Sequence, residues 1–179
     1  GTGGLYIRKG LDEKIAPLMM GGTGSRSEFE EQPDFMPDKY ESGTQNAIGL
    51  AGLGAGIAYI RTQGVEAIRQ KEMALTQAFL EGAAALKGVR LYGPDAPEKR
   101  TAVVSFNIDG MVPSETAMRL DEDYGIMCRP GLHCAPLAHR TVGTFPQGTV
   151  RFGFGYYNTM DQVRQAVKAI EEISRSVNR

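Results

Sequence analysis

The densest cluster of reactive side chains in this sequence is the run Arg-Pro-Gly-Leu-His-Cys-Ala-Pro at 129–136. It begins with Arg129 and holds one of the two cysteines, Cys134, beside one of the two histidines, His133. A cysteine attacks as its thiolate, and neighbouring cations lower the pKa of a thiol. One glycine and two prolines indicate a shaped loop rather than a helix or strand. The run predicts a nucleophilic thiol on a loop; by composition alone, a surface cysteine beside a structural histidine is an equal alternative.

A metal site is the second interpretation of the same region, with Cys128, His133, Cys134 and His139 as its ligands. Structural zinc sites usually place paired ligands at gaps of about two to four residues. The spacing of these four residues does not fit that pattern, so we expect no metal.

Arg151 lies within the apolar run Thr-Val-Arg-Phe-Gly-Phe at 149–154, which is typical of a strand. An arginine among apolar neighbours needs a partner, and its planar guanidinium matches a carboxylate with two parallel hydrogen bonds. We interpret Arg151 as a carboxylate ligand. An outward-facing strand arginine is the alternative.

Gly43 and Thr44 stand where a helix is expected to begin, and a helix N-terminus with a hydroxyl suits a phosphate. The alternative is that Thr44 or Ser42 only caps its own helix. The earlier run Gly-Thr-Gly-Ser at 22–25 lacks the Gly-Lys-Ser/Thr ending of a nucleotide-triphosphate loop, so alone it is a weak phosphate signal.

Hydrophobic periodicity predicts the elements that position these residues. We expect strands at 5–8, 89–92, 101–108, 126–129 and 149–154, and helices at about 44–63 and 65–86. A third helix is expected to open at Pro113-Ser114, and a last helix is expected to bury Val163, Ala166, Val167, Ile170 and Ile173. Ser114 is the expected N-cap of the third helix, Gly125 its stop, and Thr159 with Gln162 a capping box before the last helix. Strands that alternate with amphipathic helices after residue 89 indicate an α/β or α+β lobe.

The expected helix at 44–63 contains four glycines, each of which weakens a helix by about 1 kcal/mol relative to alanine. Such a helix needs tertiary packing, so we expect it to be buried against another element or subunit.

Composition excludes several classes. The net charge of −1 lacks the basic surplus of a general nucleic-acid binder. No apolar run approaches the roughly 20 residues of a membrane-spanning helix. Two cysteines cannot form a disulfide framework, which favours a reducing compartment, the cytoplasm.

Five stretches together resemble the class V aminotransferase group of pyridoxal-phosphate enzymes, and within it the cysteine desulfurases and selenocysteine lyases. They are Gly-Thr-Gly-Gly-Leu-Tyr-Ile at 1–7, Gly-Gly-Thr-Gly-Ser at 21–25, Tyr-Glu-Ser-Gly-Thr at 40–44, the loop at 129–136, and Val-Arg at 150–151 with Tyr-Asn-Thr at 157–159. The resemblance implies the C-terminal half of a fold type I transferase, with a small-domain sheet and flanking helices. Residues 1–43 would be a remnant of the large cofactor-binding domain, 44–64 a bridging helix, and 65–179 the small domain.

The resemblance also implies roles. Cys134 would be the catalytic nucleophile that takes sulfur from L-cysteine, becomes a persulfide and leaves L-alanine. His133 would take part in catalysis from the same loop. Arg151 would hold the substrate carboxylate, and Arg129 would line the substrate site.

Gly43 and Thr44 would bind the phosphate of pyridoxal 5′-phosphate, across the interface of a homodimer. A sulfur-acceptor protein is a further implied partner. The alternatives are a selenocysteine lyase acting on selenocysteine, another class V aminotransferase, or a non-catalytic scaffold or dimerisation module.

In this family the cofactor forms a Schiff base with a lysine just upstream of the stretch that matches 1–7. We therefore expect the chain, which starts without Met, to be part of a longer protein, and we expect the 179 residues alone to be inactive.

Overall fold

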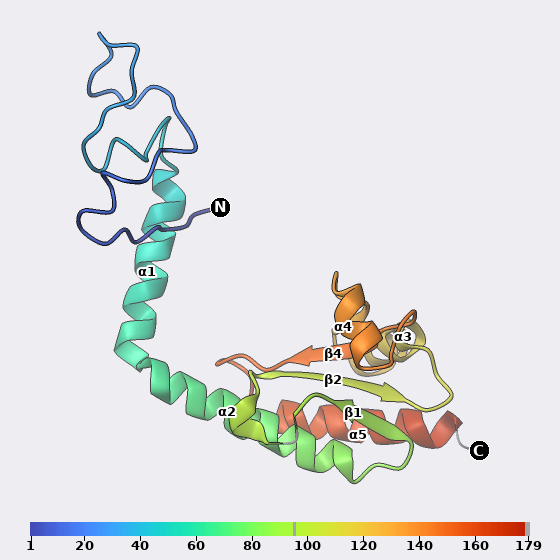
Figure 1. Ribbon diagram of the computed structural model, residues 1–179. Coiled ribbons are helices and arrows are strands. Elements are labelled where there is room, and N and C mark those ends of the chain that lie inside the picture. Colours follow the sequence, from blue (N-terminus) through green and yellow to red (C-terminus); the bar gives the residue numbers. More distant parts are fainter. Residues whose placement is uncertain (95, 178–179) are drawn as a thin grey trace. The chain divides into compact units, whose positions relative to one another are not determined.

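The computed structural model describes residues 1–94 and 96–177, which divide into two units, 1–62 and 63 onward (Figure 1). The interpretation of 1–43 as a large-domain remnant and 44–64 as a bridging helix stays a prediction. None of the described helices is both long and apolar enough to cross a bilayer.

The first unit consists of turns at 1–46 followed by helix α1 (Ala47–Gln63). The hydroxyl of Tyr40 donates to the carbonyl oxygens of Asp12 and Ile15, at 3.0 and 2.8 Å, which ties the turns together. The strand expected at 5–8 is wrong. A strand needs a neighbouring strand for its backbone hydrogen bonds, and the described part of this unit offers none.

Helix α1 confirms the helix expected at 44–63 except for its start, which lies at Ala47, and none of its residues is buried in the part of the chain that the structure describes. Its apolar side chains stay open to solvent, and Ile48 is 89% exposed. The expected burial is therefore not found within the first unit as described, because residues 1–46 form no helix or strand that could cover α1.

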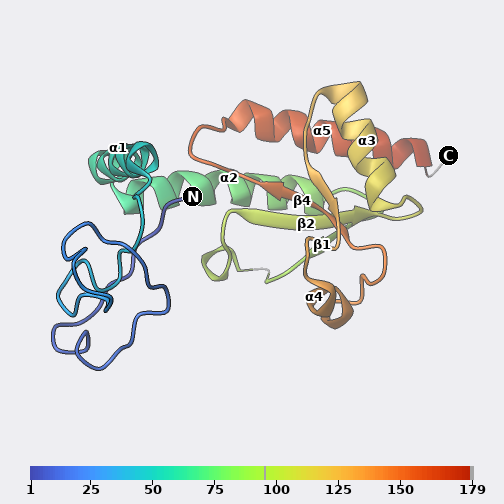
Figure 2. The same cartoon turned by 90° about the horizontal axis from the view of Figure 1, so that it is seen from above.

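The second unit contains a four-stranded antiparallel sheet in the order β1-β2-β4-β3. Figure 2 shows β1, β2 and β4 side by side in that order. Its strands are β1 (Val89–Tyr92), β2 (Val103–Ile108), β3 (Arg129–Gly131) and β4 (Thr149–Gly153). Its helices are α2 (Val65–Ala84), α3 (Pro113–Tyr124), α4 (Pro136–Thr141) and α5 (Met160–Val177), with a 3-10 turn at Pro97–Lys99. This arrangement confirms the α+β prediction.

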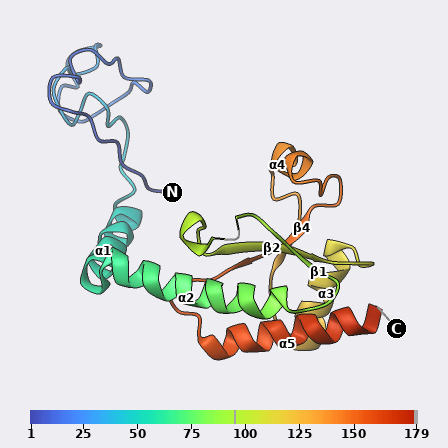
Figure 3. The same ribbon diagram turned by 60° about the horizontal axis from the view of Figure 1, so that its bottom comes forward.

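Helices α2, α3 and α5 pack on one face of the sheet, and α4 lies on the other side (Figure 3). The core on the helical face is aromatic. The ring of Phe79 on α2 lies 5.3 to 5.9 Å from the rings of Phe106, Phe152 and Phe154. Side chains alternate along a strand, so burial of Val150 and Phe152 turns the residue between them, at 151, toward the face that carries α4.

Several sequence predictions concerned the ends of elements. Gly125 stops α3 in a left-handed conformation (φ 65°), and Thr159 and Gln162 form the expected capping box, with reciprocal bonds of 3.0 and 3.3 Å. Ser114 is not the N-cap: α3 begins at Pro113, so Val112 holds that position. Proline suits the first helical turn because it lacks the N–H that would go unpaired there.

The strand expected at 126–129 is shifted to β3 at Arg129–Gly131. Ile126 and Cys128 pack against the core instead of pairing with β4. The β3–β4 ladder consequently starts only where Arg129 meets Arg151.

Candidate active site

The loop between β3 and α4 presents Cys134 at an exposed turn. His133 and Cys134 both have left-handed backbone conformations, with φ of 52° and 59°. Few non-glycine residues adopt this region, which costs of order 1–3 kcal/mol each and is concentrated at functional sites. The N–H of Ala135 donates to the carbonyl of Leu132 at 2.8 Å and closes the turn. The thiol therefore lies at the tip of a tight, strained connection.

Arg129 reaches from β3 to this thiol. Its Nη2 lies 3.6 Å from Sγ of Cys134, within hydrogen-bonding distance for sulfur. The guanidinium donates in this contact and the sulfur accepts. The contact links Arg129, at the start of the run 129–136, to the cysteine within that run.

His133 is anchored by the backbone of Arg129, whose carbonyl oxygen lies 2.8 Å from Nε2. Because a carbonyl can only accept, Nε2 carries a proton and the neutral ring has its lone pair on Nδ1. Burial lowers the pKa of His133 below its ordinary value of 6.5, and the charges of Arg151, His139 and Arg129 lower that pKa further, against the opposing bond to the Arg129 carbonyl. The imidazole is thus neutral at pH 7, with Nδ1 able to accept a proton.

Arg151 lies in the middle of β4, where it pairs with Arg129 on β3 and with Ser105 on β2. Directly paired residues of antiparallel strands point to the same face, with Cβ atoms roughly 5 Å apart. The charge of Arg151 also lowers the pKa of His133, so its guanidinium lies within electrostatic range of the loop. The structure therefore brings Arg151, Arg129, His133 and Cys134 together on the face that carries α4.

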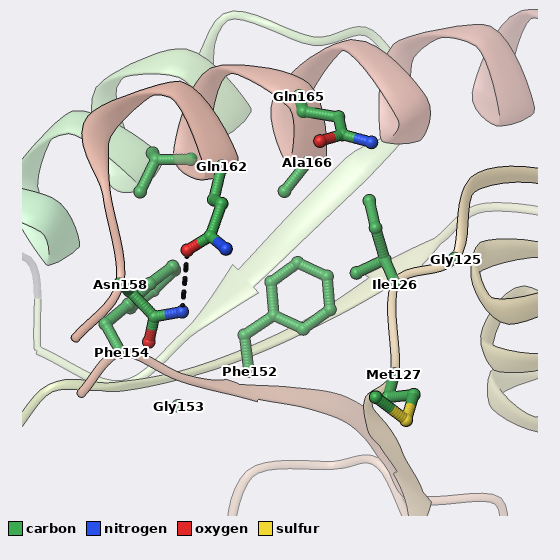
Figure 4. A pocket seen from close by; sticks show the side chains of 11 residues that line it. Gly125, Ile126, Met127, Phe152, Gly153, Phe154, Asn158, Gln162, Gln165 and Ala166 are labelled. Atoms are coloured by element: carbon green, nitrogen blue, oxygen red, sulfur yellow. Dashed lines mark hydrogen bonds between the residues drawn. The ribbon is translucent and has the colours of Figure 1, made fainter.

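The four residues do not line the pocket of about 290 Å³ that opens at the edge of the sheet (Figure 4). That pocket lies between the start of α5, the end of β4 and the segment 125–127, with Phe152, Met127 and Gln162 among its walls. The Nδ2 of Asn158 donates to Oε1 of Gln162 there, at 3.0 Å. The candidate site is instead an open surface around the loop.

Gly43 and Thr44 belong to the first unit. Gly43 has φ of 83° and donates its N–H to the carbonyl of Gly22 at 2.8 Å. Asn46 caps α1, since its Oδ1 accepts from the N–H of Gly49 at 3.0 Å. The alternative that Thr44 or Ser42 caps this helix therefore does not hold. Thr44 therefore does not stand at the helix N-terminus as expected, because α1 begins three residues later at Ala47. Its exposed hydroxyl can still donate to a phosphate, such as that of pyridoxal phosphate.

Cys128 lies outside the cluster. Burial, with the nearby charge of Asp121, raises the pKa of its thiol to about 11, so it stays protonated at neutral pH. Within 1–94 and 96–177, no group of three or more His, Cys, Asp or Glu side chains is placed to hold a metal ion.

Sequence reasoning named His139 only as a metal ligand and missed its contacts. His139 is 6% exposed on α4, its Nδ1 lies 2.7 Å from Oγ1 of Thr144, and its ring centroid lies 5.5 Å from that of His133. The available signal was Pro136, which suits the first position of a helix and would have placed His139 in its first turn.

The fold and the site define an α+β lobe with an exposed thiol and two arginines on the face of its sheet that carries α4. A family model for the class-V aminotransferases matches residues 1–166. The chain belongs to the class-V aminotransferase family.

Curated relatives support this assignment. The chain is 36% identical to a probable cysteine desulfurase of Methanothermobacter thermautotrophicus and 36% identical to one of Pyrococcus abyssi, over 97% and 99% of this chain. In each case the match covers 44% of the relative, so the chain spans less than half the length of the relatives it matches.

Two solved structures share the fold. An apo cysteine desulfurase from Thermococcus onnurineus matches 96% of this chain and 42% of its own, with a TM-score of 0.83 and 34% identity. A cysteine desulfurase from Escherichia coli matches the same shares, with a TM-score of 0.81 and 25% identity. The chain therefore has the fold of the C-terminal portion of these fold type I enzymes.

Proposed function

We propose that this chain forms the sulfur-accepting part of a pyridoxal-phosphate-dependent cysteine desulfurase. The observation that carries the proposal is the contact of 3.6 Å between the Arg129 guanidinium and the exposed Cys134 thiol. A half-buried, protonated thiol such as Cys128 could not serve, because a protonated thiol is a poor nucleophile.

The substrate carboxylate binds Arg151. Two guanidinium groups, of Arg151 and Arg129, share one face of the sheet, and an anion between them would offset their repulsion. Fixing the carboxylate orients the amino acid so that its sulfur faces the loop.

The sulfur of Cys134 then attacks the sulfur of the bound cysteine. A sulfur–sulfur bond forms, the carbon–sulfur bond of the substrate breaks, and its electron pair passes to the substrate carbon, which takes a proton. The products are a persulfide on Cys134 and L-alanine. His133 acts as the general base: its Nδ1 removes the proton of the Cys134 thiol.

Pyridoxal phosphate, when bound, withdraws electrons from the substrate and weakens its carbon–sulfur bond. Gly43 and Thr44 hold its phosphate from the first unit of a partner chain in a homodimer, and a separate acceptor protein takes the persulfide sulfur from the exposed loop.

The test is a steady-state assay of alanine formation from cysteine. It uses a chimera in which the Methanothermobacter relative supplies the length outside the matched region. C134A should abolish alanine formation, whereas C128S should retain it. Alanine formation that persists in the C134A chimera would overturn the proposal, and activity restricted to selenocysteine would favour a selenocysteine lyase.

A further inference from the structure

The reactive loop is supported by a buried histidine for which the proposed reaction has no use. His139 is 6% exposed, and Oγ1 of Thr144 lies 2.7 Å from its Nδ1. Backbone hydrogen bonds join the same residues: the N–H groups of Thr144 and Phe145 both donate to the carbonyl of His139, at 2.8 and 3.2 Å. The end of α4 and the turn after it are thus fastened to one residue.

From this anchored position the ring of His139 packs on the loop. Its centroid lies 5.5 Å from that of His133, with a tilt of 50°. His133 in turn donates to the carbonyl of Arg129 at 2.8 Å, and the Arg129 guanidinium contacts the thiol of Cys134. A continuous series of contacts therefore leads from Thr144 to the reactive sulfur.

We propose that His139, held by Thr144, is a positioning residue that backs His133 and thereby keeps the Arg129 guanidinium against Cys134. The functional meaning of this inference rests on the proposed sulfur transfer. Two consecutive left-handed residues persist only where their surroundings fix them. The buried imidazole supplies that constraint from the side of α4, while the Arg129 carbonyl supplies it from β3.

The experiment measures alkylation of Cys134 by iodoacetamide in the 179-residue chain, with Cys128 in the same molecule as reference. T144V removes the hydroxyl and keeps the shape of the side chain. Loss of one buried hydrogen bond changes an equilibrium constant by about fivefold. The population of the ordered loop, and with it the alkylation rate of Cys134, should therefore fall by up to about that factor. T144S, which restores the hydroxyl, should restore the rate.

A second set of variants distinguishes the positioning of Arg129 against Cys134 from a general loosening of the fold. R129A should slow Cys134 alkylation, and R129A/T144V should slow it no further, because both changes remove the same contact. An unchanged Cys134 rate in T144V, or an equal additional slowing by T144V in the R129A background, would overturn the proposal.

The rate of Cys128 detects unfolding, because this thiol is half-buried and becomes accessible when the chain opens. If T144V raises the alkylation rate of Cys128, H139Q replaces T144V in the experiment. Its amide can still bond to Thr144, but it has no ring to pack on His133, so the alkylation rate of Cys134 should fall in this variant too. None of these rates depends on desulfurase activity. Persistent alanine formation in C134A would therefore overturn the proposed function without changing them.

Discussion

Arg129 lies directly opposite Arg151 in the β3–β4 ladder, so two guanidinium groups share the face of the sheet from which the Cys134 loop emerges. Like charges directly opposite one another destabilise a sheet. An arrangement that weakens the fold yet matches a carboxylate is expected of a binding site rather than of a structural feature.

The first prediction follows from this pairing. R151Q removes one charge of the pair, so the free energy of unfolding should rise by roughly 0.2–1 kcal/mol. Urea unfolding of the 179-residue chain measures it. R164Q is the control, because the Arg164 side chain on α5 is exposed and lies beside the opposite charge of Asp161. A less stable R151Q protein would show that Arg151 stabilises the fold through contacts other than a bound anion.

The second prediction concerns the titration of His133. Its pKa lies below 6.5, partly because of the charge of Arg151. R151Q should therefore raise this pKa toward its ordinary value, as measured from imidazole resonances by NMR. No change in the resonances' titration would mean that Arg151 is too far from the loop to act on it.

The same shift sets a pH dependence of stability. Below 6.5 the unfolded state binds a proton at His133 more readily than the folded state does, so the free energy of unfolding falls as the pH drops from 6.5 through the lowered folded-state pKa. H133N should flatten the profile of unfolding free energy in that range. Equal slopes in the two proteins would contradict the lowered pKa.

The third prediction compares the two thiols. Cys134 is exposed beside a guanidinium, whereas burial raises the pKa of Cys128 to about 11. Iodoacetamide should therefore modify Cys134 first, and peptide mass spectrometry locates the label. C134S should leave only slow labelling of Cys128, and preferential labelling of Cys128 in the unchanged chain would reverse the assignment of the reactive thiol.

The fourth prediction tests the core on which the site rests. Phe79 is fully buried among three aromatic rings, so F79A should lower the free energy of unfolding by about 3–5 kcal/mol. V65A changes a 71% exposed residue of the same helix and should stay within about 0.5 kcal/mol of the unchanged chain. Similar losses in both variants would indicate that α2 does not pack on the sheet through Phe79.

Local patterns predicted much of this fold. Apolar residues at alternate positions, Val104, Phe106 and Ile108, predicted the strand β2, and all three are buried. The stop at Gly125 and the capping box before α5 were predictable because each depends on residues a few positions apart. The strand at 5–8 failed because a strand also depends on a neighbour that is distant in sequence.

The geometry of the site was less predictable. The reactive loop was evident from the residue types at 129–136, but the pairing of Arg129 with Arg151 depends on register, which no local pattern fixes. The left-handed conformation of His133 and Cys134 involves no glycine, so nothing in the sequence marks it. The packing of His139 on His133 depends on helix α4. This helix has only six residues, which is too short for hydrophobic periodicity to predict it.

The central claim is that the sulfur of cysteine passes to Cys134. A single turnover of the chimera with cysteine, followed by digestion and mass spectrometry without reductant, tests it directly. Sulfur transfer to Cys134 predicts one additional sulfur atom on the peptide that contains Cys134 and none on the peptide that contains Cys128. Alanine formed while the Cys134 peptide keeps its unmodified mass would show that the sulfur does not pass to this thiol.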